Sequence, residues 1–344
     1  MFSSVQPLVS IIVPAYNAEK YLRASLDSIL SQTYRNSEIT VWDDASTDTT
    51  PAILNSYADS VRVIRQPGNR GIYDNVNDGI AMAKGEFIAI YHADDIYMPT
   101  MVEREVEFLV KYPRAGAVFT NMTFMGPDSE DLGRLELPEE LPKACPLDYG
   151  AVLNGLLQHK NHFLMCPTAM VRAAAYREVG VYRQNLFFDS SDLDMWVRIA
   201  RKYPVGLLEE RLLRYRHFHN SSSLRYQKLR TEEDLHFRIV DLCLDDGGRS
   251  LATPEALAAH EAHRAEDLMI AATSNYIMDR REDAARLLSR VRAKRILGSP
   301  RIQRGRMLLL FAMLHVLVRL PRIGLVAHAF RRRFHEKGPS KTKK

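Results

Sequence analysis

Short apolar runs alternate with amphipathic segments in the first third of the chain. The apolar runs, at residues 9–13, 38–42, 61–65 and 85–91, contain mainly β-branched, aliphatic and aromatic residues and have the length of buried strands. Between them, apolar residues recur at helical spacing, which predicts helices through Leu22 and Leu30, through Ile53 and Tyr57, and over 74–83. This order predicts an α/β fold, a Rossmann-like, mostly parallel sheet with helices on both faces.

Polar clusters stand where three of the predicted strands end. Tyr16 and Asn17 follow the first strand, Asp44 follows the second, and Asp94 and Asp95 follow the fourth. In open parallel sheets, ligands bind outside the carboxyl ends of the strands. Three clusters at that edge favour a binding site over ordinary loop polarity.

The adjacent carboxylates of Asp94 and Asp95 need a separate explanation. Like charges at the end of a buried strand repel, and each resists the loss of water. A divalent cation relieves both costs, and Mg²⁺ or Mn²⁺ favours carboxylate oxygens while also holding substrate phosphates. The alternative is a helix N-terminus, because Pro99 and a helical pattern from Met101 follow soon after.

Four blocks of this sequence resemble the inverting family 2 glycosyltransferases of the GT-A fold. The blocks are residues 10–17, 43–48, 77–86 and 93–95, and their order and spacing match over roughly the first two-thirds of the chain. The resemblance implies a nucleotide-sugar donor, usually a UDP-sugar, bound at the sheet edge. It implies that Tyr16 lines the base pocket with Pro14 and Asn17, and that Asp44 hydrogen-bonds the base.

The resemblance also implies that Asp94 and Asp95 bind the sugar-diphosphate and its metal ion, Mn²⁺ or Mg²⁺, with Asp95 as the direct ligand. His92 stands where the family often has an acid, and we expect a neutral polar residue lining the site rather than a ligand. Lys84 and Arg70 are candidates to neutralise the diphosphate charge, although basic surface residues are common.

Residues 189–196 resemble the block of the family that holds the general base, and this places the base at Asp192. Ser191 stands where the family usually has Glu. The alternative is that the acids of this segment, including Asp194, only favour the N-terminus of the helix that follows. Both interpretations can hold at once, in which case Asp192 is the base and Asp194 has a structural role.

Two further segments resemble the acceptor side of the family. Residues 162–171 and the helix after them resemble the strand and helix against which the acceptor docks. Residues 214–223 resemble the family's basic tail, in which His217 and His219 are both candidates for diphosphate or metal contact. Solvated loop histidines are the alternative.

Composition limits the classes of protein that remain. With 344 residues and 46% apolar content, the chain can bury a catalytic domain and a second module. Three cysteines at irregular spacing argue against a disulfide framework and a zinc site, and together with a short polar start they predict a cytoplasmic protein. The basic C-terminus lacks interleaved aromatic residues, so we expect no nucleic-acid partner.

The chain is expected to divide into a GT-A catalytic domain, 1–230, and a helical C-terminal extension with a basic tail, 231–344. Within the first, 1–100 is expected to bind the nucleotide-sugar and 101–230 the acceptor. The apolar runs 307–320 and 323–330 are too short and interrupted to predict a transmembrane span, and flanking arginines suit peripheral contact of 305–344 with an anionic membrane. A core helix with a disordered basic tail is the alternative.

The predicted function is metal-assisted transfer of a sugar, with inversion, to a glycan or lipid-linked acceptor. The alternative is an inactive nucleotide-sugar-binding or scaffolding protein on the same fold. The presence of Asp192 favours the enzyme, because a protein that only binds its ligand has no use for a general base.

Overall fold

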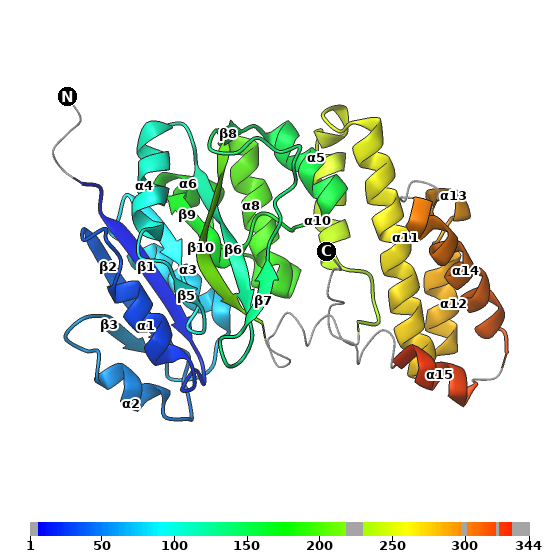
Figure 1. Cartoon of the computed structure of the whole chain (residues 1–344), viewed down its shortest axis with the longest axis horizontal. Coiled ribbons are helices and arrows are strands. Elements are labelled where there is room, and N and C mark those ends of the chain that lie inside the picture. Colours follow the sequence, from blue (N-terminus) through cyan, green and yellow to red (C-terminus); the bar gives the residue numbers. More distant parts are fainter. Residues whose placement is uncertain (1–5, 218–229, 297–300, 321–322, 332–344) are drawn as a thin grey trace. The chain divides into compact units, whose positions relative to one another are not determined.

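The computed structural model describes residues 6–217, 230–296, 301–320 and 323–331. These residues belong to two compact units, 1–218 and 219–344 (Figure 1). The sequence placed the division after residue 230 instead. The last strand of the first unit already ends at Arg216.

One mixed sheet organises the first unit. Its main path has the order β3-β2-β1-β4-β9-β6-β10-β5, with β7 beside β6 and β8 beside β10. The strands are β1 (Val9–Ala15), β2 (Ser37–Asp43), β3 (Arg62–Arg65), β4 (Phe87–Ile90), β5 (Ile96–Tyr97), β6 (Ala117–Met125), β7 (Asp131–Arg134), β8 (Pro146–Leu147), β9 (Ala169–Arg172) and β10 (Val205–Arg216).

Strand direction determines which residues meet at each edge of the sheet. β1 runs parallel to β2 and β4, β2 is parallel to β3, and β6 is parallel to β10. β9 is antiparallel to both β4 and β6, so these two strands share one direction. The amino end of β9 therefore lies at the edge where the long parallel strands have their carboxyl ends. The predicted mostly parallel sheet is confirmed.

Helices cover both faces of the sheet, as predicted (Figure 1). They are α1 (Leu22–Leu30), α2 (Thr50–Asn55), α3 (Ile72–Met82), α4 (Met101–Lys111), α5 (Tyr149–His159), α6 (Ala173–Val179), α7 (Gln184–Phe187) and α8 (Ser191–Lys202). α2 ends before the predicted Tyr57, because the N–H groups of Ser56 and Tyr57 close tighter turns onto Ile53 and Leu54.

Alternate side chains of the inner strands point to opposite faces of the sheet, where they pack against helices. Ile11 and Val13 of β1 pack in the core with Leu26 of α1. On the opposite face α3 approaches β1 so closely that a Cβ on Gly79 would lie 2.7 Å from the side chain of Ile12. The core contains residues from both predicted halves of this unit, and one sheet runs through them. The assignment of 1–100 to donor and 101–230 to acceptor stays a prediction.

The second unit is helical in its described residues. It contains α10 (Leu235–Asp245), α11 (Pro254–Ile277), α12 (Arg281–Ser289), α13 (Ala293–Ile296), α14 (Arg301–Leu317) and α15 (Gly324–Arg331). Thr253 caps α11 by accepting the N–H of Ala256, and Pro254 begins the helix where its missing N–H costs nothing. None of the described helices is long and apolar enough to cross a bilayer.

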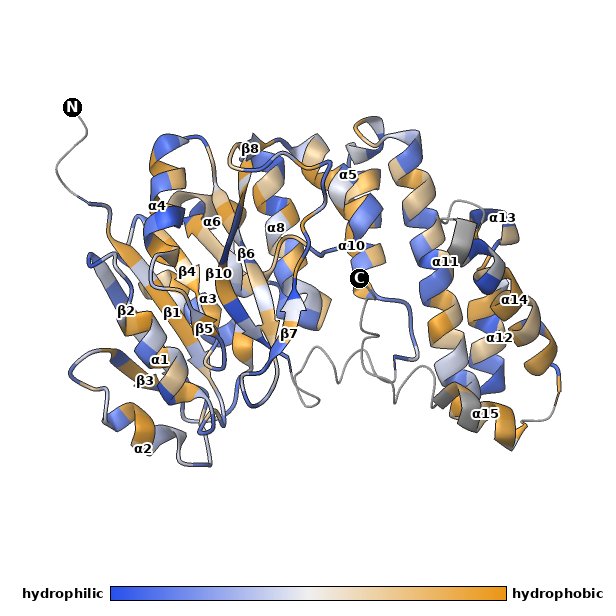
Figure 2. Cartoon of the chain, viewed as in Figure 1, coloured by the Kyte–Doolittle hydropathy of each residue, from blue (hydrophilic) through white to orange (hydrophobic). Residues whose placement is uncertain are grey.

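The long apolar run near the C-terminus is part of the core of this second unit. Met307, Leu314 and Leu317 of α14 are buried with residues of α11 and α12. Other apolar residues are exposed, among them Leu309 of α14 at 71% and Leu325 of α15 at 85%. Figure 2 shows the apolar character of α14 and α15 in orange.

Candidate active site

The carboxyl edge of the sheet gathers polar residues from four strands. Tyr16 follows β1, Asp44 follows β2, and the loop of Asp94 and Asp95 follows β4. β10 ends at this edge with Arg216. The three polar clusters of the sequence thus lie at one edge of the sheet, as parallel strand ends require.

Asp95 is fully buried at this edge, and only one of its two carboxylate oxygens accepts a hydrogen bond from the described residues. Its Oδ1 accepts a hydrogen bond from the backbone N–H of Arg216 at 2.7 Å. Its Oδ2 is buried and accepts no hydrogen bond from the described residues, with Nδ1 of His92 3.6 Å away. Burial raises the pKa of Asp95 well above its ordinary value, and Asp94 raises it further, against the opposing effect of Arg216. A cation would stabilise the charged form.

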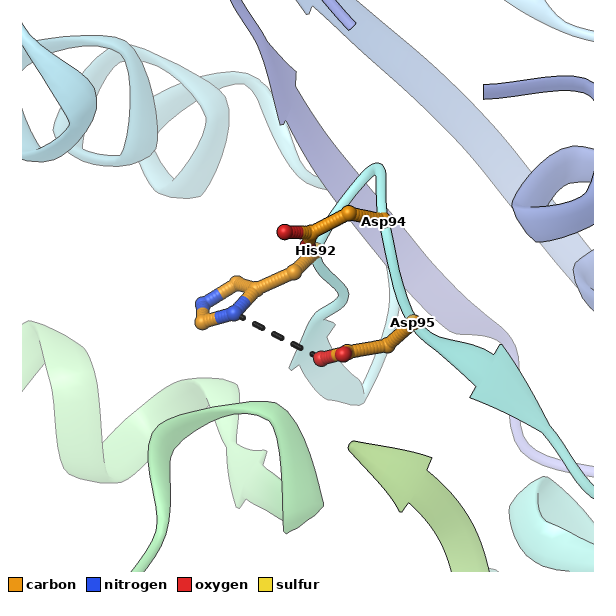
Figure 3. A group of neighbouring side chains, drawn as sticks. All are labelled: His92, Asp94 and Asp95. Atoms are coloured by element: carbon orange, nitrogen blue, oxygen red, sulfur yellow. Dashed lines mark ion pairs between the residues drawn. The ribbon is translucent and has the colours of Figure 1, made fainter. Parts of the chain in front are cut away.

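The surroundings of this oxygen fit a divalent metal ion. His92, Asp94 and Asp95 each offer one ligand atom, and these atoms lie within 4.8 Å of one another (Figure 3). Within the described ranges no other group of three or more His, Cys, Asp or Glu meets this criterion. Burial also raises the pKa of Asp94 and lowers that of His92. A buried carboxylate oxygen that accepts no hydrogen bond from the described residues, beside two further ligand atoms, is suited to Mn²⁺ or Mg²⁺.

Asp44 holds a loop across the sheet edge. Its Oδ1 accepts the backbone N–H of Arg70 at 2.8 Å and its Oδ2 that of Gly71 at 2.9 Å. The residue is only 4% exposed. Because each carboxylate oxygen has a second lone pair, Asp44 can still accept a hydrogen bond from a ligand.

At the end of β1 and just after it, Pro14 and Asn17 make contacts within the protein, whereas Tyr16 is accessible to a ligand. Pro14 is buried in β1, beside Trp42 of β2. Asn17 adopts a left-handed backbone conformation, φ +48°, and its Oδ1 accepts the backbone N–H of Thr47 at 2.9 Å. Tyr16 is 50% exposed, so its ring is available to a flat ligand group. Pro14 and Asn17 therefore shape the edge, and Tyr16 lies open on it.

Asp192 and Asp194 occupy different environments in the first turn of α8. Asp194 is buried between two cations, with Nε of Arg183 2.9 Å and Nε of Arg198 3.1 Å from its Oδ2. Asp192 is partly buried and forms no ion pair within the described residues. Burial raises the pKa of Asp192 to about 7, although the Leu193 N–H bonds its Oδ1. A carboxylate with this pKa is suited to take a proton near neutral pH.

Cys166 lies within range of the charges of both Asp192 and Asp95. This buried residue begins the short 3₁₀ turn η1 (Cys166–Thr168), directly before β9. Burial raises the pKa of its thiol well above the ordinary value, and the negative charges of Asp192 and Asp95 raise it further. Because charge effects weaken with distance, both carboxylates lie near this thiol. The antiparallel direction of β9 brings its amino end to the carboxyl edge.

Comparison with known proteins places this arrangement in a family. The family described as Glycosyl transferase family 2 matches residues 10–180. The putative glycosyltransferase EpsE of Bacillus subtilis is 32% identical over 220 residues, which cover 61% of this chain and 73% of that protein. The chain belongs to glycosyl transferase family 2. An uncharacterized glycosyltransferase of Rickettsia felis is 30% identical over 66% of this chain, which spans only 37% of that longer relative.

Solved structures show that this family 2 glycosyltransferase has the GT-A fold. Staphylococcus aureus TarS 1–349 in complex with UDP-GlcNAc aligns with a TM-score of 0.59 at 18% identity, covering 94% of this chain and 89% of that one. The mannosyltransferase PcManGT of Pyrobaculum calidifontis, in complex with GDP-Man and Mn²⁺, aligns with a TM-score of 0.54 at 18% identity, covering 97% and 89%. The predicted family and fold class are confirmed.

The family 2 glycosyltransferase also contains a buried arginine that the sequence analysis does not single out. Arg216 is 3% exposed, and its Nε donates to the backbone carbonyl of Asp94 at 2.8 Å. Its Nη1 donates to the carbonyl of Gly126 at 3.0 Å, and its guanidinium lies over the ring of Tyr21. Arg216 thus holds the Asp94–Asp95 loop through both its backbone and its side chain. Its position in the basic tail beside His217 was the only signal in the sequence.

Two side-chain amides connect α3 to the segment before α8. The side chain of Asn77 on α3 both donates to the carbonyl of Tyr182, at 3.1 Å, and accepts its N–H, at 2.8 Å. Oε1 of Gln184 accepts the N–H of Tyr73 at 3.2 Å, and the rings of Tyr73 and Tyr182 stack with centroids 5.2 Å apart. This contact sets the position of α7 and α8, and with them Asp192.

Asn77→Ala should lower the free energy of unfolding by about 1–3 kcal/mol, because the N–H and C=O of Tyr182 lose their partners in a partly buried site. Urea denaturation measures the effect. Asn36→Ala removes one exposed side-chain bond, to the carbonyl of Gln6, and should cost less than about 0.5 kcal/mol. Equal losses in the two variants would contradict the proposed role of Asn77.

Of the remaining predicted residues, Lys84 is not brought into this group, and the two histidines are placed separately. Lys84 lies before the amino end of β4, where its N–H bonds Glu38, and therefore at the opposite edge of the sheet. From that position Lys84 cannot neutralise a diphosphate bound at the carboxyl edge. His217 follows β10 beside Arg216, and its N–H bonds the carbonyl of Met125 at 2.7 Å. His219 lies outside the described residues.

Proposed function

We propose that this family 2 glycosyltransferase transfers a sugar from a nucleoside-diphosphate donor, a UDP-sugar in the first instance, to a glycan or lipid-linked acceptor with inversion. The observation that carries the proposal is the buried Oδ2 of Asp95, which accepts no hydrogen bond from the described residues and, like the carboxylate of Asp192, acts on the thiol of Cys166. The complexes of TarS with UDP-GlcNAc and of PcManGT with GDP-Man support a nucleotide-sugar donor.

In the proposed reaction, Asp192 takes the proton of an acceptor hydroxyl while that oxygen attacks the anomeric carbon of the donor. The bond from this carbon to the diphosphate oxygen breaks on the opposite face, so the configuration inverts. Asp94 and Asp95 would hold the divalent cation, which when bound neutralises the departing diphosphate. Asp44 accepts a hydrogen bond from the base, and Tyr16 covers it. The pKa of Asp192, about 7, favours an enzyme over a protein that only binds its ligand.

A screen of nucleotide-sugar hydrolysis with Mn²⁺ or Mg²⁺ tests this function. One donor should be hydrolysed slowly in the presence of a cation, and acceptor trials with that donor should then give a glycoside of inverted configuration. Retained configuration would contradict direct displacement. Failure to bind any nucleoside diphosphate with either cation would contradict the donor assignment.

We further propose that the C-terminal segment 305–344 contacts an anionic membrane peripherally. The apolar residues Leu309 and Leu325 are exposed, Arg306 and Arg319 of the same segment are exposed as well, and the sequence after residue 330 is rich in Arg and Lys. Apolar contact combined with positive charge is suited to an anionic lipid surface. A lipid-linked acceptor would be within reach of an enzyme bound there.

The double variant Leu309→Glu with Leu325→Glu should weaken binding to anionic vesicles by about tenfold or more, since it removes two apolar contacts and adds two negative charges. Vesicle sedimentation measures the effect, and binding by the unmodified chain should weaken as salt rises. Leu242→Glu, at an exposed position on α10, is the matched control. These point changes keep α14 in place, whereas truncation before Gly305 would remove its buried residues from the core. Unchanged vesicle binding by the double variant would contradict membrane contact.

A further inference from the structure

The imidazole of His92 faces the oxygen of Asp95 that accepts no hydrogen bond from the described residues. Nδ1 of His92 lies 3.6 Å from this Oδ2, just beyond hydrogen-bond distance. Figure 3 shows the two groups pointing toward each other, with Asp94 extending from the same side of the loop. Two ligand atoms that each lie about 2.1 Å from one small cation are about 3.0–3.5 Å apart. The observed separation is close to that of two ligands on one ion.

The backbone holds His92 in this position from two directions. Its N–H donates to the hydroxyl oxygen of Tyr97 at 2.5 Å, and its carbonyl accepts from Oγ of Ser25 at 2.9 Å. Asp95 is held independently by the N–H of Arg216. The backbone of His92 and the carboxylate of Asp95 are therefore held by contacts that do not depend on each other, which favours a preformed metal site.

We propose that His92 is a third protein ligand of the cation, and that this mixed imidazole and carboxylate site selects Mn²⁺ over Mg²⁺. Mg²⁺ prefers oxygen ligands in a strict octahedron and loses water reluctantly, whereas imidazole nitrogen binds first-row transition ions well. From the sequence alone, His92 is expected to line the site as a neutral polar residue rather than to bind the metal. This proposal rests on the proposed function, in which the same cation neutralises the donor diphosphate.

Pulsed electron paramagnetic resonance on the full-length protein with Mn²⁺ and UDP tests the ligand directly. The bound Mn²⁺ should show coupling to an imidazole ¹⁴N nucleus. The coupling should disappear in His92→Asn and persist in His217→Asn. Persistence in His92→Asn, with loss in His217→Asn, would identify the other histidine and overturn the proposal.

Calorimetric titration of Mn²⁺ and of Mg²⁺, each with UDP present, tests the selectivity. The unmodified protein should bind Mn²⁺ at least about tenfold more tightly than Mg²⁺, and His92→Asp, with three carboxylates, should reduce this ratio by about tenfold. If the third carboxylate of His92→Asp impairs folding, His92→Asn tests the same loss of imidazole without adding a charge. Circular dichroism checks that both variants are folded.

The outcomes separate this inference from the function on which it rests. Mn²⁺ binding without coupling to a nitrogen of His92 overturns the inference and leaves the function standing. An unchanged ratio of affinities in His92→Asp also overturns it. Absence of any Mn²⁺ or Mg²⁺ binding in the presence of UDP would remove the cation from both proposals.

Discussion

Asp192→Asn should leave donor binding intact and lower the rate of sugar transfer by about 10²–10⁴-fold. The amide keeps the shape of the side chain and can still accept the N–H of Leu193, but it cannot take the proton of the acceptor hydroxyl. Calorimetry with UDP and a transfer assay with the donor found by screening separate the two effects. Asp189→Asn, an exposed acid before α8, is the matched control and should retain most of the activity.

The pH dependence provides a second measurement on the same residue. Asp192 must be unprotonated to act as a base, so kcat/KM should rise with pH through about 7, and Asp192→Asn should lose this rise. Stability should change in the opposite sense. Because the folded pKa lies above the unfolded value of about 3.9, ionisation of Asp192 destabilises the fold as pH rises between them.

Asp192→Asn should therefore have a higher Tm than the unmodified protein at pH 8, with a difference that shrinks toward pH 4. If Asp192→Asn retained a near-normal rate of transfer, another residue would have to be the general base. Asp194 is poorly placed for that role because Arg183 and Arg198 already neutralise it.

Asp95→Asn should abolish cation-dependent binding of nucleoside diphosphate and reduce transfer by about a thousandfold or more. The amide can still accept the N–H of Arg216, so the loop keeps its position, but the negative charge on the buried Oδ2 is lost. A metal ion that acts as a Lewis acid is worth several kcal/mol in the transition state, which corresponds to a loss of this size. Calorimetry with UDP, in the presence and absence of Mn²⁺, measures the effect.

The thermal midpoint separates a lost metal site from a damaged fold. Without metal, Asp95→Asn should be at least as stable as the unmodified protein, because it removes a carboxyl group whose ionisation burial opposes. Asp131→Asn, at an exposed strand position, is a control that should change neither binding nor Tm appreciably. Equal binding of UDP with and without Mn²⁺ in both proteins would contradict the assignment of Asp95.

The strands and helices around the site were predictable because their signals are local. The β-branched run in β1 and the helical spacing from Leu22 to Ile29 depend on near neighbours in the chain, and both elements form where expected. The gathering of Asp44 and Asp95 at one edge also followed from the sequence, since parallel strands place their carboxyl ends together. The identity of the base came from a resemblance between short blocks, and the site residues remain proposals.

Other features of the site depend on contacts between distant parts of the chain. Lys84 is close to Asp94 in sequence, yet it lies at the other edge, because β4 separates the two along its full length. Cys166 comes within range of the charges of both Asp192 and Asp95 because β9, which follows it, runs antiparallel to its neighbours and so begins at the carboxyl edge. Strand direction in a mixed sheet is set by pairing, which no local pattern encodes.

The amino-acid pattern alone was therefore sufficient for the α/β alternation, the polar strand ends and the acidic pair, all of which follow from periodicity and neighbouring charge. Only the folded chain decided that one oxygen of Asp95 accepts no hydrogen bond from the described residues, that Arg216 holds its loop, and that burial raises the pKa of Asp192 to about 7. The physical reason is that burial and hydrogen bonding of a carboxylate depend on what surrounds it in space. That environment is built from residues more than a hundred positions away in the sequence, as the hydrogen bond from Arg216 to Asp95 shows.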